Sequence, residues 1–313
     1  MDQDIMDIEA IITQMVILFL LVVAGFVSHK VKIMGGEFDR KLSSLVIQVT
    51  CPCIILASTM GERMPDRNCI LPLLAVGAMT YVILIGAGFV IPHIMPVKRD
   101  ERGIYGFMLA YANVGFIGYP IIASIFGSDA VFYACILNVP NTLTIFVFGI
   151  MFVTGQKAGT FDWKLLYSPA MLSTYLSIVI VASGWHAPRV VSEPLTLLGN
   201  MTVPAALLII GSSIAAMPAR QMTGNRGTYS LALMRLLFLP LTVLAVMRLI
   251  GVDERIAGIN TILAGMPVAS YGTMFCLKYG RDETVMSQGT FLTTLLSVLS
   301  IPLLVMIIHG HLF

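Results

Sequence analysis

Charged side chains are scarce in this sequence. Only 12% of the 313 residues are Asp, Glu, Lys or Arg, whereas 57% are hydrophobic, and the mean hydropathy is +0.89. A soluble domain carries about 25% charged residues, so this chain cannot cover its surface with charge and its solvent must be largely lipid. The net charge of +2 gives no indication of nucleic-acid binding. The length leaves no room for a separate soluble domain.

Other absences narrow the function. No Asp or Glu falls deep within an apolar stretch, which excludes an intramembrane aspartyl protease and argues against a carboxylate-based proton relay or sodium site. The histidines lie near the ends of the stretches or in a loop flank, so no Ser–His pair is apparent. Cys51 and Cys53 have no nearby His, Asp or Glu to complete a metal site. We therefore expect no enzyme, no metal and no cofactor.

The apolar residues fall into ten stretches, each close to the length that a helix needs to cross a bilayer, about 20 residues. Because lipid offers the backbone no hydrogen-bond partners, such stretches are expected to be helical. The sequence therefore predicts an all-α membrane protein with ten transmembrane helices, numbered here 1 to 10: 8–28, 42–60, 69–95, 103–126, 130–155, 168–185, 194–217, 228–250, 256–277 and 284–309.

Lys and Arg are distributed unevenly between the loops. The odd-numbered loops hold 13 of them, and the even-numbered loops with their flanks hold five. Positive loops stay in the cytoplasm, so we expect both termini to face outside. The acidic residues near the N-terminus are the opposite of the basic start of a cleavable signal peptide.

The two halves of the chain show a weak internal repeat. Thr50-x-Pro in helix 2 and Thr202-x-Pro in helix 7 are 152 residues apart, and Gly127 and Gly280, after helices 4 and 9, are 153 apart. Five helices in each half would give the halves opposite orientation. We therefore predict two inverted five-helix repeats, 1–155 and 156–313, an arrangement typical of secondary transporters.

Helices 4 and 9 are both interrupted by Gly and Pro at membrane depth. Asn113 in helix 4 and Met266 in helix 9 are 153 residues apart, so the interruptions correspond in the repeat. Paired breaks indicate a transport site, and the exposed N-termini of half-helices suit a carboxylate. We prefer this interpretation to one in which the small residues only allow close packing. The predicted substrate-binding residues here are Asn113, Val114, Gly115, Gly118, Pro120, Gly265, Met266 and Pro267.

The stretch from Tyr111 to Gly127 resembles the crossover of the auxin efflux carrier family, which includes the PIN-type auxin transporters of plants. Five residues match its motif: Asn113, Gly118, Pro120, Ile121 and Gly127. Pro267 falls at the crossover proline of helix 9. The sequence departs from the plant motif at Ala112, Val114 and Val268, where the plant proteins have proline, threonine and glutamine.

The resemblance implies a fold like that of bile acid sodium symporters, with crossing broken helices 4 and 9. Helices 1, 2, 6 and 7 would form a scaffold, often the dimer interface, and helices 3–5 and 8–10 a transport domain. The substrate, an auxin-like monocarboxylate or a malate- or malonate-like dicarboxylate, would bind between them beside Asn113 and Pro267. By this resemblance we expect a homodimer in the inner membrane of a bacterium.

Several other polar residues fall inside predicted helices. Thr50, Thr202, Asn200 and Gln48 occupy equivalent places in helices 2 and 7, and we favour the cavity wall over helix–helix packing for them. Two asparagines of helix 5 either brace the crossover or cap a proline kink, and both readings stay open. Ser270 is a further candidate. Arg235 could bind a substrate carboxylate or extend to the interface, and we favour the interface. The asparagines are Asn138 and Asn141.

Together these features predict a secondary transporter of a small organic anion with elevator-like alternating access. Coupling to Na⁺ or protons is left open, as is uncoupled movement. The alternative is a ligand-binding sensor that keeps the transporter fold without transport. A channel ranks below both because it has no need for opposed broken helices.

Overall fold

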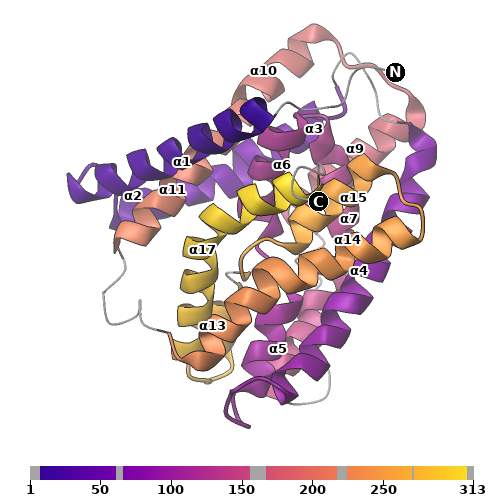
Figure 1. Ribbon diagram of the computed structural model, residues 1–313. Helices are drawn as coiled ribbons and strands as arrows, with labels where there is room; N and C mark the ends of the chain where they lie inside the picture. Colours follow the sequence, from indigo (N-terminus) through magenta and orange to yellow (C-terminus); the bar gives the residue numbers. More distant parts are fainter. Residues whose placement is uncertain (1–7, 61–65, 156–166, 217–223, 270, 309–313) are drawn as a thin grey trace.

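The computed structural model describes residues 8–60, 66–155, 167–216, 224–269 and 271–308, and among these residues the chain is helical with no β-strand. Each of the ten apolar stretches contains helix, as expected (Figure 1). The first half comprises α1 (Ile8–Lys30), α2 (Gly36–Leu45), α3 (Cys51–Ala57), α4 (Ile70–Val90), α5 (Arg102–Ala110), α6 (Tyr119–Phe126), α7 (Ala130–Thr144) and α8 (Ile150–Thr154). The second comprises α9 (Pro169–Ser183), α10 (Arg189–Asn200), α11 (Thr202–Ala216), α13 (Arg226–Leu233), α14 (Leu239–Leu249), α15 (Glu254–Ala264), α16 (Tyr271–Lys278) and α17 (Thr284–Ile308).

Continuous helices long and apolar enough to cross a membrane number five among the described residues, or six if one bent pair is a single span. They are Gly36–Ala57, Ile70–His93, Arg189–Ala216, Arg226–Leu249 and Thr284–Ile308, with Ala130–Thr144 and Val147–Thr154 as the bent pair. Stretches 4 and 9 are not among these continuous spans, as the breaks predicted in helices 4 and 9 lead one to expect. The count of ten spans stays a prediction.

Wide π-helical turns interrupt four of the helices: η1 (Val46–Thr50), η4 (Val114–Gly118), η5 (Ile145–Gly149) and η7 (Met234–Phe238). Three of them end two residues before a proline, namely Pro52, Pro120 and Pro240. Proline donates no hydrogen bond and its ring crowds the carbonyl one turn back. A wider turn relieves that crowding, so the position of each proline explains where the helix loosens.

Among the described residues, the most extensive helix contact is between α1 and α11, which lie side by side over much of their length (Figure 1). Glycine makes this possible. A Cβ atom on Gly25 would lie 2.1 Å from the carbonyl oxygen of Leu208, and one on Gly211 would lie 1.9 Å from that of Val22. Small residues of this kind let helix backbones approach in a membrane. Elsewhere α3 packs on α9 and α10, whereas α4 packs on α5 and α7, and α14 on α15.

The deepest part of the core surrounds the two interrupted helices. Every residue of α5 from Ile104 to Ala110 is buried, and so is every residue of α15 from Ala257 to Ala264. A helix that is buried on all sides can be apolar all round. The other helices therefore enclose both breaks, and polar backbone groups at the breaks have to find partners within the protein.

Candidate functional site

The first break lies between α5 and η4. The helix ends at Ala110, Tyr111 adopts an extended conformation (φ −114°, ψ 125°), and the next helical turn begins at Val114. From there the helix continues through η4 and α6 to Phe126. The N-terminal end of this second half-helix is left with backbone N–H groups that have no carbonyl one turn earlier. The prediction of a break at this position is confirmed.

The second break lies between α15 and α16. The helix ends at Ala264, where Gly265 leaves the helical conformation (φ −84°, ψ 2°), and helix resumes at Tyr271. Pro267 lies between the two and can donate no backbone hydrogen bond. The interruption predicted in helix 9 is therefore present as well. Ser270 lies outside the described residues.

The two breaks contact each other through their backbones. The N–H of Asn113 donates to the carbonyl of Pro267 at 2.8 Å, and the N–H of Ala269 donates to the carbonyl of Tyr111 at 3.1 Å. The two extended segments thus form one antiparallel bridge, centred on Ala112 and Val268. Groups freed by the breaks are thereby satisfied inside the protein, as the apolar surroundings require.

Two side chains also form hydrogen bonds with backbone groups at the breaks. The Val268 N–H donates to Oγ1 of Thr293 on α17 at 3.2 Å. Arg235 on η7 donates from Nη1 to the carbonyl of Leu109 at 2.6 Å and from Nε to the carbonyl of Met266 at 3.2 Å. The side chain of Arg235 is 0% exposed. The interpretation that Arg235 extends to the membrane interface is therefore wrong, because its hydrogen bonds hold it at the breaks.

A cavity of about 480 Å³ opens beside the bridge. Its walls come from five parts of the chain: α2 to α3, the first break with η4 and α6, α7 with η5, the start of α9, and the second break with α16. This volume falls in the range of small-molecule sites, about 300–1,000 Å³. The lining residues are Ser43, Ile47, Cys51, Ala112, Asn113, Val114, Gly115, Phe116, Tyr119, Asn138, Asn141, Thr142, Ile145, Ser168, Pro169, Ala170, Met171, Thr174, Ala269 and Tyr271.

A hydrogen-bonded group of amides and phenols forms one wall of this cavity. Asn138 donates from Nδ2 to the hydroxyl of Tyr119 at 3.0 Å, and its Oδ1 accepts from Asn141 at 3.0 Å and from Tyr81 at 3.4 Å. Because Tyr119 begins α6, Asn138 contacts the helix that follows the first break, which is the contact expected of a brace. Oδ1 of Asn141 is buried and has no partner among the described residues.

Among the residues that the structure describes, none that lines the cavity is Asp, Glu, Lys or Arg. The positive potential available to a ligand comes instead from helix ends. The helix that begins at Val114 presents its N-terminus to the cavity, and α16 begins there at Tyr271. A helix N-terminus is equivalent to roughly half a positive charge. The cavity can therefore attract a carboxylate without a basic side chain.

The residues predicted from sequence divide into two sets. Those lining the cavity are Asn113, Val114, Gly115, Asn138 and Asn141. Those buried at or near the breaks, or in η1 and α11, but not lining it are Gly118, Pro120, Gly265, Met266, Pro267, Thr50, Thr202 and Arg235. Gln48 and Asn200 are exposed and do not line the cavity either. A substrate-binding role stays a prediction for all of these residues, those that line the cavity included.

Sequence reasoning missed four hydroxyl-bearing side chains of the lining: Ser43, Thr142, Ser168 and Thr174. Thr142 follows Asn141 directly and could have been included with it. Ser168 accepts a hydrogen bond from the N–H of Met171 and caps α9, so its sequence signal is that of an ordinary helix start. Nothing in the sequence singles out Ser43 or Thr174.

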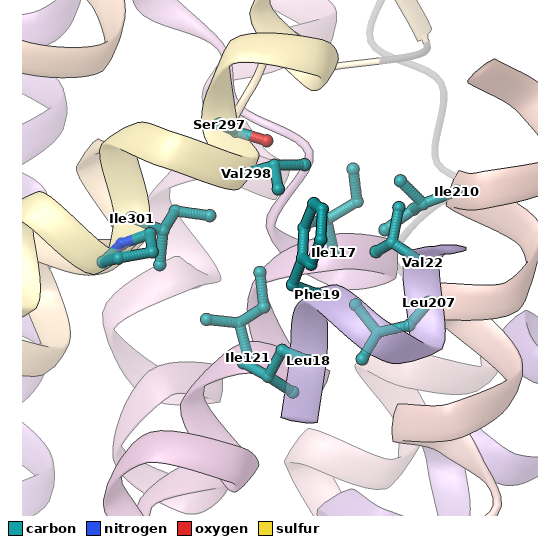
Figure 2. A pocket seen from close by; sticks show the side chains of 11 residues that line it. Leu18, Phe19, Val22, Ile117, Ile121, Leu207, Ile210, Ser297, Val298 and Ile301 are labelled. Carbon is teal, nitrogen blue, oxygen red and sulfur yellow. The ribbon is translucent and has the colours of Figure 1, made fainter. Parts of the chain in front are cut away.

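A second, much smaller pocket of about 50 Å³ is apolar (Figure 2). Leu18 and Val22 of α1 face Ile117 and Ile121 from the helix that follows the first break, and α11 and α17 close the rest. In contrast to the 480 Å³ cavity, it offers almost no polar group. It marks an incompletely filled contact between α1, α11 and the neighbouring helices.

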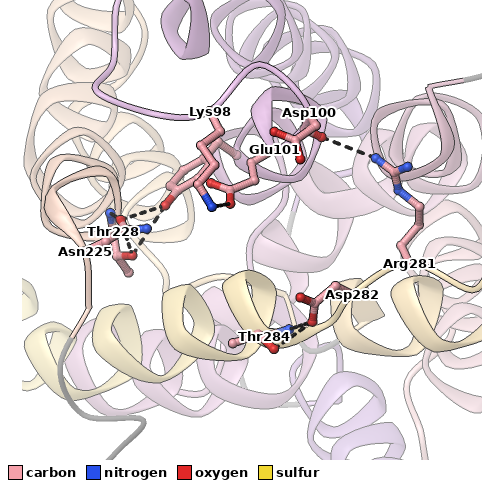
Figure 3. A network of polar contacts seen from close by, with 9 residues as sticks. Lys98, Asp100, Glu101, Asn225, Thr228, Arg281, Asp282 and Thr284 are labelled. Atoms are coloured by element: carbon pink, nitrogen blue, oxygen red, sulfur yellow. Dashed lines mark hydrogen bonds and ion pairs between the residues drawn. The ribbon is translucent and has the colours of Figure 1, made fainter.

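Polar residues join three loops at one end of the molecule (Figure 3). Arg281, before α17, donates to the carbonyl of Asp100, before α5, at 3.3 Å. The hydroxyl of Tyr105 on α5 donates to Asn225, before α13, at 3.1 Å. These three loops are among those that the distribution of Lys and Arg assigns to a common side of the membrane.

A helical chain whose two interrupted helices pair beside a cavity of small-molecule size has the organisation of a membrane transport protein. The model of the membrane transport protein family matches residues 10–160 and again residues 157–305. The chain therefore belongs to this family, the auxin efflux carrier family that its motifs resemble. The family consists of transporters rather than enzymes, as expected from the sequence.

Similar proteins come from archaea and bacteria. An uncharacterised transporter of Methanocaldococcus jannaschii is 22% identical over 298 residues, covering 92% of this chain and 95% of the relative. An uncharacterised transporter of Methanothermobacter thermautotrophicus is 24% identical over 293 residues, covering 91% and 94%. A protein of Rhizobium meliloti named "Putative malonate transporter" is 22% identical over 305 residues, covering 93% and 94%.

Proposed function

We propose that this protein is a secondary transporter that moves a small organic anion across the membrane. The observation that carries the proposal is the 480 Å³ cavity at the paired breaks, into which a helix N-terminus opens. Interrupted helices that expose such ends to a cavity are the recurrent substrate site of secondary transporters. Asn113, Asn138 and Asn141 would orient the bound anion from one side.

The cavity lining favours a substrate with a single negative charge. Two helix N-termini of roughly half a charge each balance about one carboxylate. In the described part of the chain, no lysine or arginine lines the cavity to pair with a second. An auxin-like monocarboxylate fits this condition best. A malate- or malonate-like dicarboxylate, suggested by the name of the Rhizobium relative, fits it when one of its two carboxyl groups is protonated.

Packing supports a movement of two helix groups against each other. We assign helices 1, 2, 6 and 7 to a scaffold (α1–α3, α9–α11) and helices 3–5 and 8–10 to a transport domain (α4–α8, α13–α17), within two inverted repeats of five helices. The cavity and the apolar pocket of Figure 2 both lie between these groups. An apolar boundary suits elevator-like sliding, because few hydrogen bonds have to break.

The cellular arrangement follows from the sequence. We propose ten spans in the inner membrane of a bacterium, in line with the family resemblance. Both termini would face the outside of the cell, on the strength of the uneven Lys and Arg distribution. The family resemblance supports a homodimer. Labelling of single cysteines placed in the loops, with a reagent that does not cross the membrane, tests the orientation: residues near 100 should be shielded in intact cells and residues near 187 should react.

A sensor that binds the same anion without transporting it is the alternative, since its site would look the same. Counterflow in vesicles separates the two functions. Vesicles loaded with an unlabelled anion should accumulate the labelled anion when the protein is a carrier, and neither a sensor nor a channel drives that accumulation. The panel consists of indole-3-acetate, malonate and malate, with and without Na⁺.

Asn113→Ala is the variant of choice, because the hydrogen bond from Asn113 to the carbonyl of Pro267 comes from the backbone N–H, which the substitution keeps. We expect it to lose both counterflow and the ligand-induced rise in melting temperature that mass action produces. Asn200→Ala is the matched control, since this exposed asparagine does not line the cavity and should behave as wild type. If both variants respond to the anion like wild type, the cavity is not the substrate site.

A further inference from the structure

A positive charge is buried where the two interrupted helices end. Arg235 is 0% exposed and donates to one carbonyl at each break: that of Leu109 in the last turn of α5, at 2.6 Å, and that of Met266 just beyond α15, at 3.2 Å. It is the one side chain among the described residues that hydrogen-bonds to both breaks. The guanidinium therefore bridges the two half-helices at their C-terminal ends.

The charge of Arg235 has no carboxylate partner. The four ion pairs among the described residues involve other side chains, and Nη2 of Arg235 is buried without any hydrogen-bond partner there. A helix C-terminus is equivalent to roughly half a negative charge. Two such ends, those of α5 and α15, offset about one positive charge, so the helix dipoles balance the buried guanidinium.

Carbonyls of this kind are where secondary transporters hold a coupling cation. Half-helix C-terminal ends and unwound backbone carbonyls coordinate Na⁺ in several such folds. In this protein, carbonyls of the same type, those of Leu109 and Met266, accept hydrogen bonds from Arg235. Arg235 lies outside the 480 Å³ cavity lining, so it is not placed to contact a bound anion.

We propose that Arg235 is a resident cation that takes the place of a coupling Na⁺ at the paired breaks. It holds the breaks together permanently, and the binding and release of a metal ion is not part of the cycle. One consequence of this role, that transport does not depend on Na⁺, rests on the proposed function as a carrier. The other part of the proposal, that the charge of Arg235 is required to join the two breaks, applies to a sensor as well.

The first test measures the melting temperature of purified protein without any substrate. Arg235→Lys keeps a charge and should retain most of the stability, whereas Arg235→Met, which is apolar and of similar length, should unfold at a clearly lower temperature. Arg248→Met is the matched control: this exposed arginine also donates to a helix-end carbonyl, that of Ile308, but it joins no break. An Arg235→Met protein as stable as Arg235→Lys would overturn the proposal.

Cation rescue distinguishes a charge requirement from a simple packing defect. Arg235→Ala leaves both carbonyls unpaired beside a space that methylguanidinium can enter. Millimolar methylguanidinium should raise the melting temperature of Arg235→Ala and leave wild type and Arg248→Ala unchanged, with choline as the inert cation. Absence of rescue in a folded Arg235→Ala protein counts against the proposal.

A final measurement uses wild type alone and is independent of how the variants fold. At constant ionic strength, replacing Na⁺ by choline should change the melting temperature of wild type by less than the error and its counterflow rate by less than twofold. A tenfold loss of counterflow without Na⁺ would refute the resident-cation role. If no counterflow occurs in either medium, the proposed carrier function fails, while the melting experiments still decide the role of Arg235.

Discussion

Replacing Gly211 by alanine tests whether α1 and α11 are as closely packed as the structure has them. The new Cβ atom would lie 1.9 Å from the carbonyl oxygen of Val22 and 2.7 Å from the backbone nitrogen of Phe26. Both contacts are with backbone, so no side chain can rotate away. The 1.9 Å contact has to lengthen by about 1.5 Å to become an ordinary one, which is an overpacking defect of the kind that costs roughly 1–3 kcal/mol.

The matched control is Gly86→Ala on α4, where a Cβ atom would meet nothing within 4 Å. Alanine is favoured over glycine in a helix by about 0.8–1.0 kcal/mol, so this variant should be as stable as wild type or slightly more stable. Both variants gain the same helix propensity, so they should differ by the overpacking cost alone, roughly 1–3 kcal/mol in free energy of unfolding.

Thermal and denaturant unfolding of the detergent-purified proteins, measured side by side, gives the difference directly. We expect Gly211→Ala to unfold at the lower temperature, and Gly25→Ala to behave similarly, because its Cβ atom would lie 2.1 Å from the carbonyl oxygen of Leu208. A Gly211→Ala protein that unfolds together with Gly86→Ala would show that α1 and α11 are further apart than described, and the reasoning on glycine contacts would fail.

Two further predictions concern buried hydrogen bonds around the breaks. Thr293→Val removes the acceptor of the buried Val268 N–H and should lower stability by about 1–3 kcal/mol; Thr294→Val, whose hydroxyl bonds only within its own helix, should lose less in the same unfolding assay. Asn260 donates to Thr80 at 2.7 Å between α15 and α4, so a double-mutant cycle of Asn260→Leu and Thr80→Val should give a coupling energy of roughly 0.5–1.5 kcal/mol. Zero coupling would refute that contact.

The sequence by itself determined the helical class, the family and the position of both breaks. Apolar stretches of about 20 residues are expected to be helical in lipid, and two glycines and a proline within eight residues, beside an asparagine, weaken a helix locally. The interruptions after Ala110 and Ala264 were accordingly predictable. The sequence did not predict that three of the prolines would follow a π-helical turn.

Only the tertiary structure decided which polar residues share a cavity. Asn200 and Asn141 are both asparagines in apolar stretches, yet one is exposed and the other lies in the cavity wall. Arg235 illustrates the same limit. Its distance along the helix suggested a side chain that reaches the interface, but its direction is set by two carbonyls contributed by residues 109 and 266. Local sequence carries the tendency of a segment to form or break a helix, whereas the partners of a buried polar group come from segments far away in the chain, and folding alone brings them together.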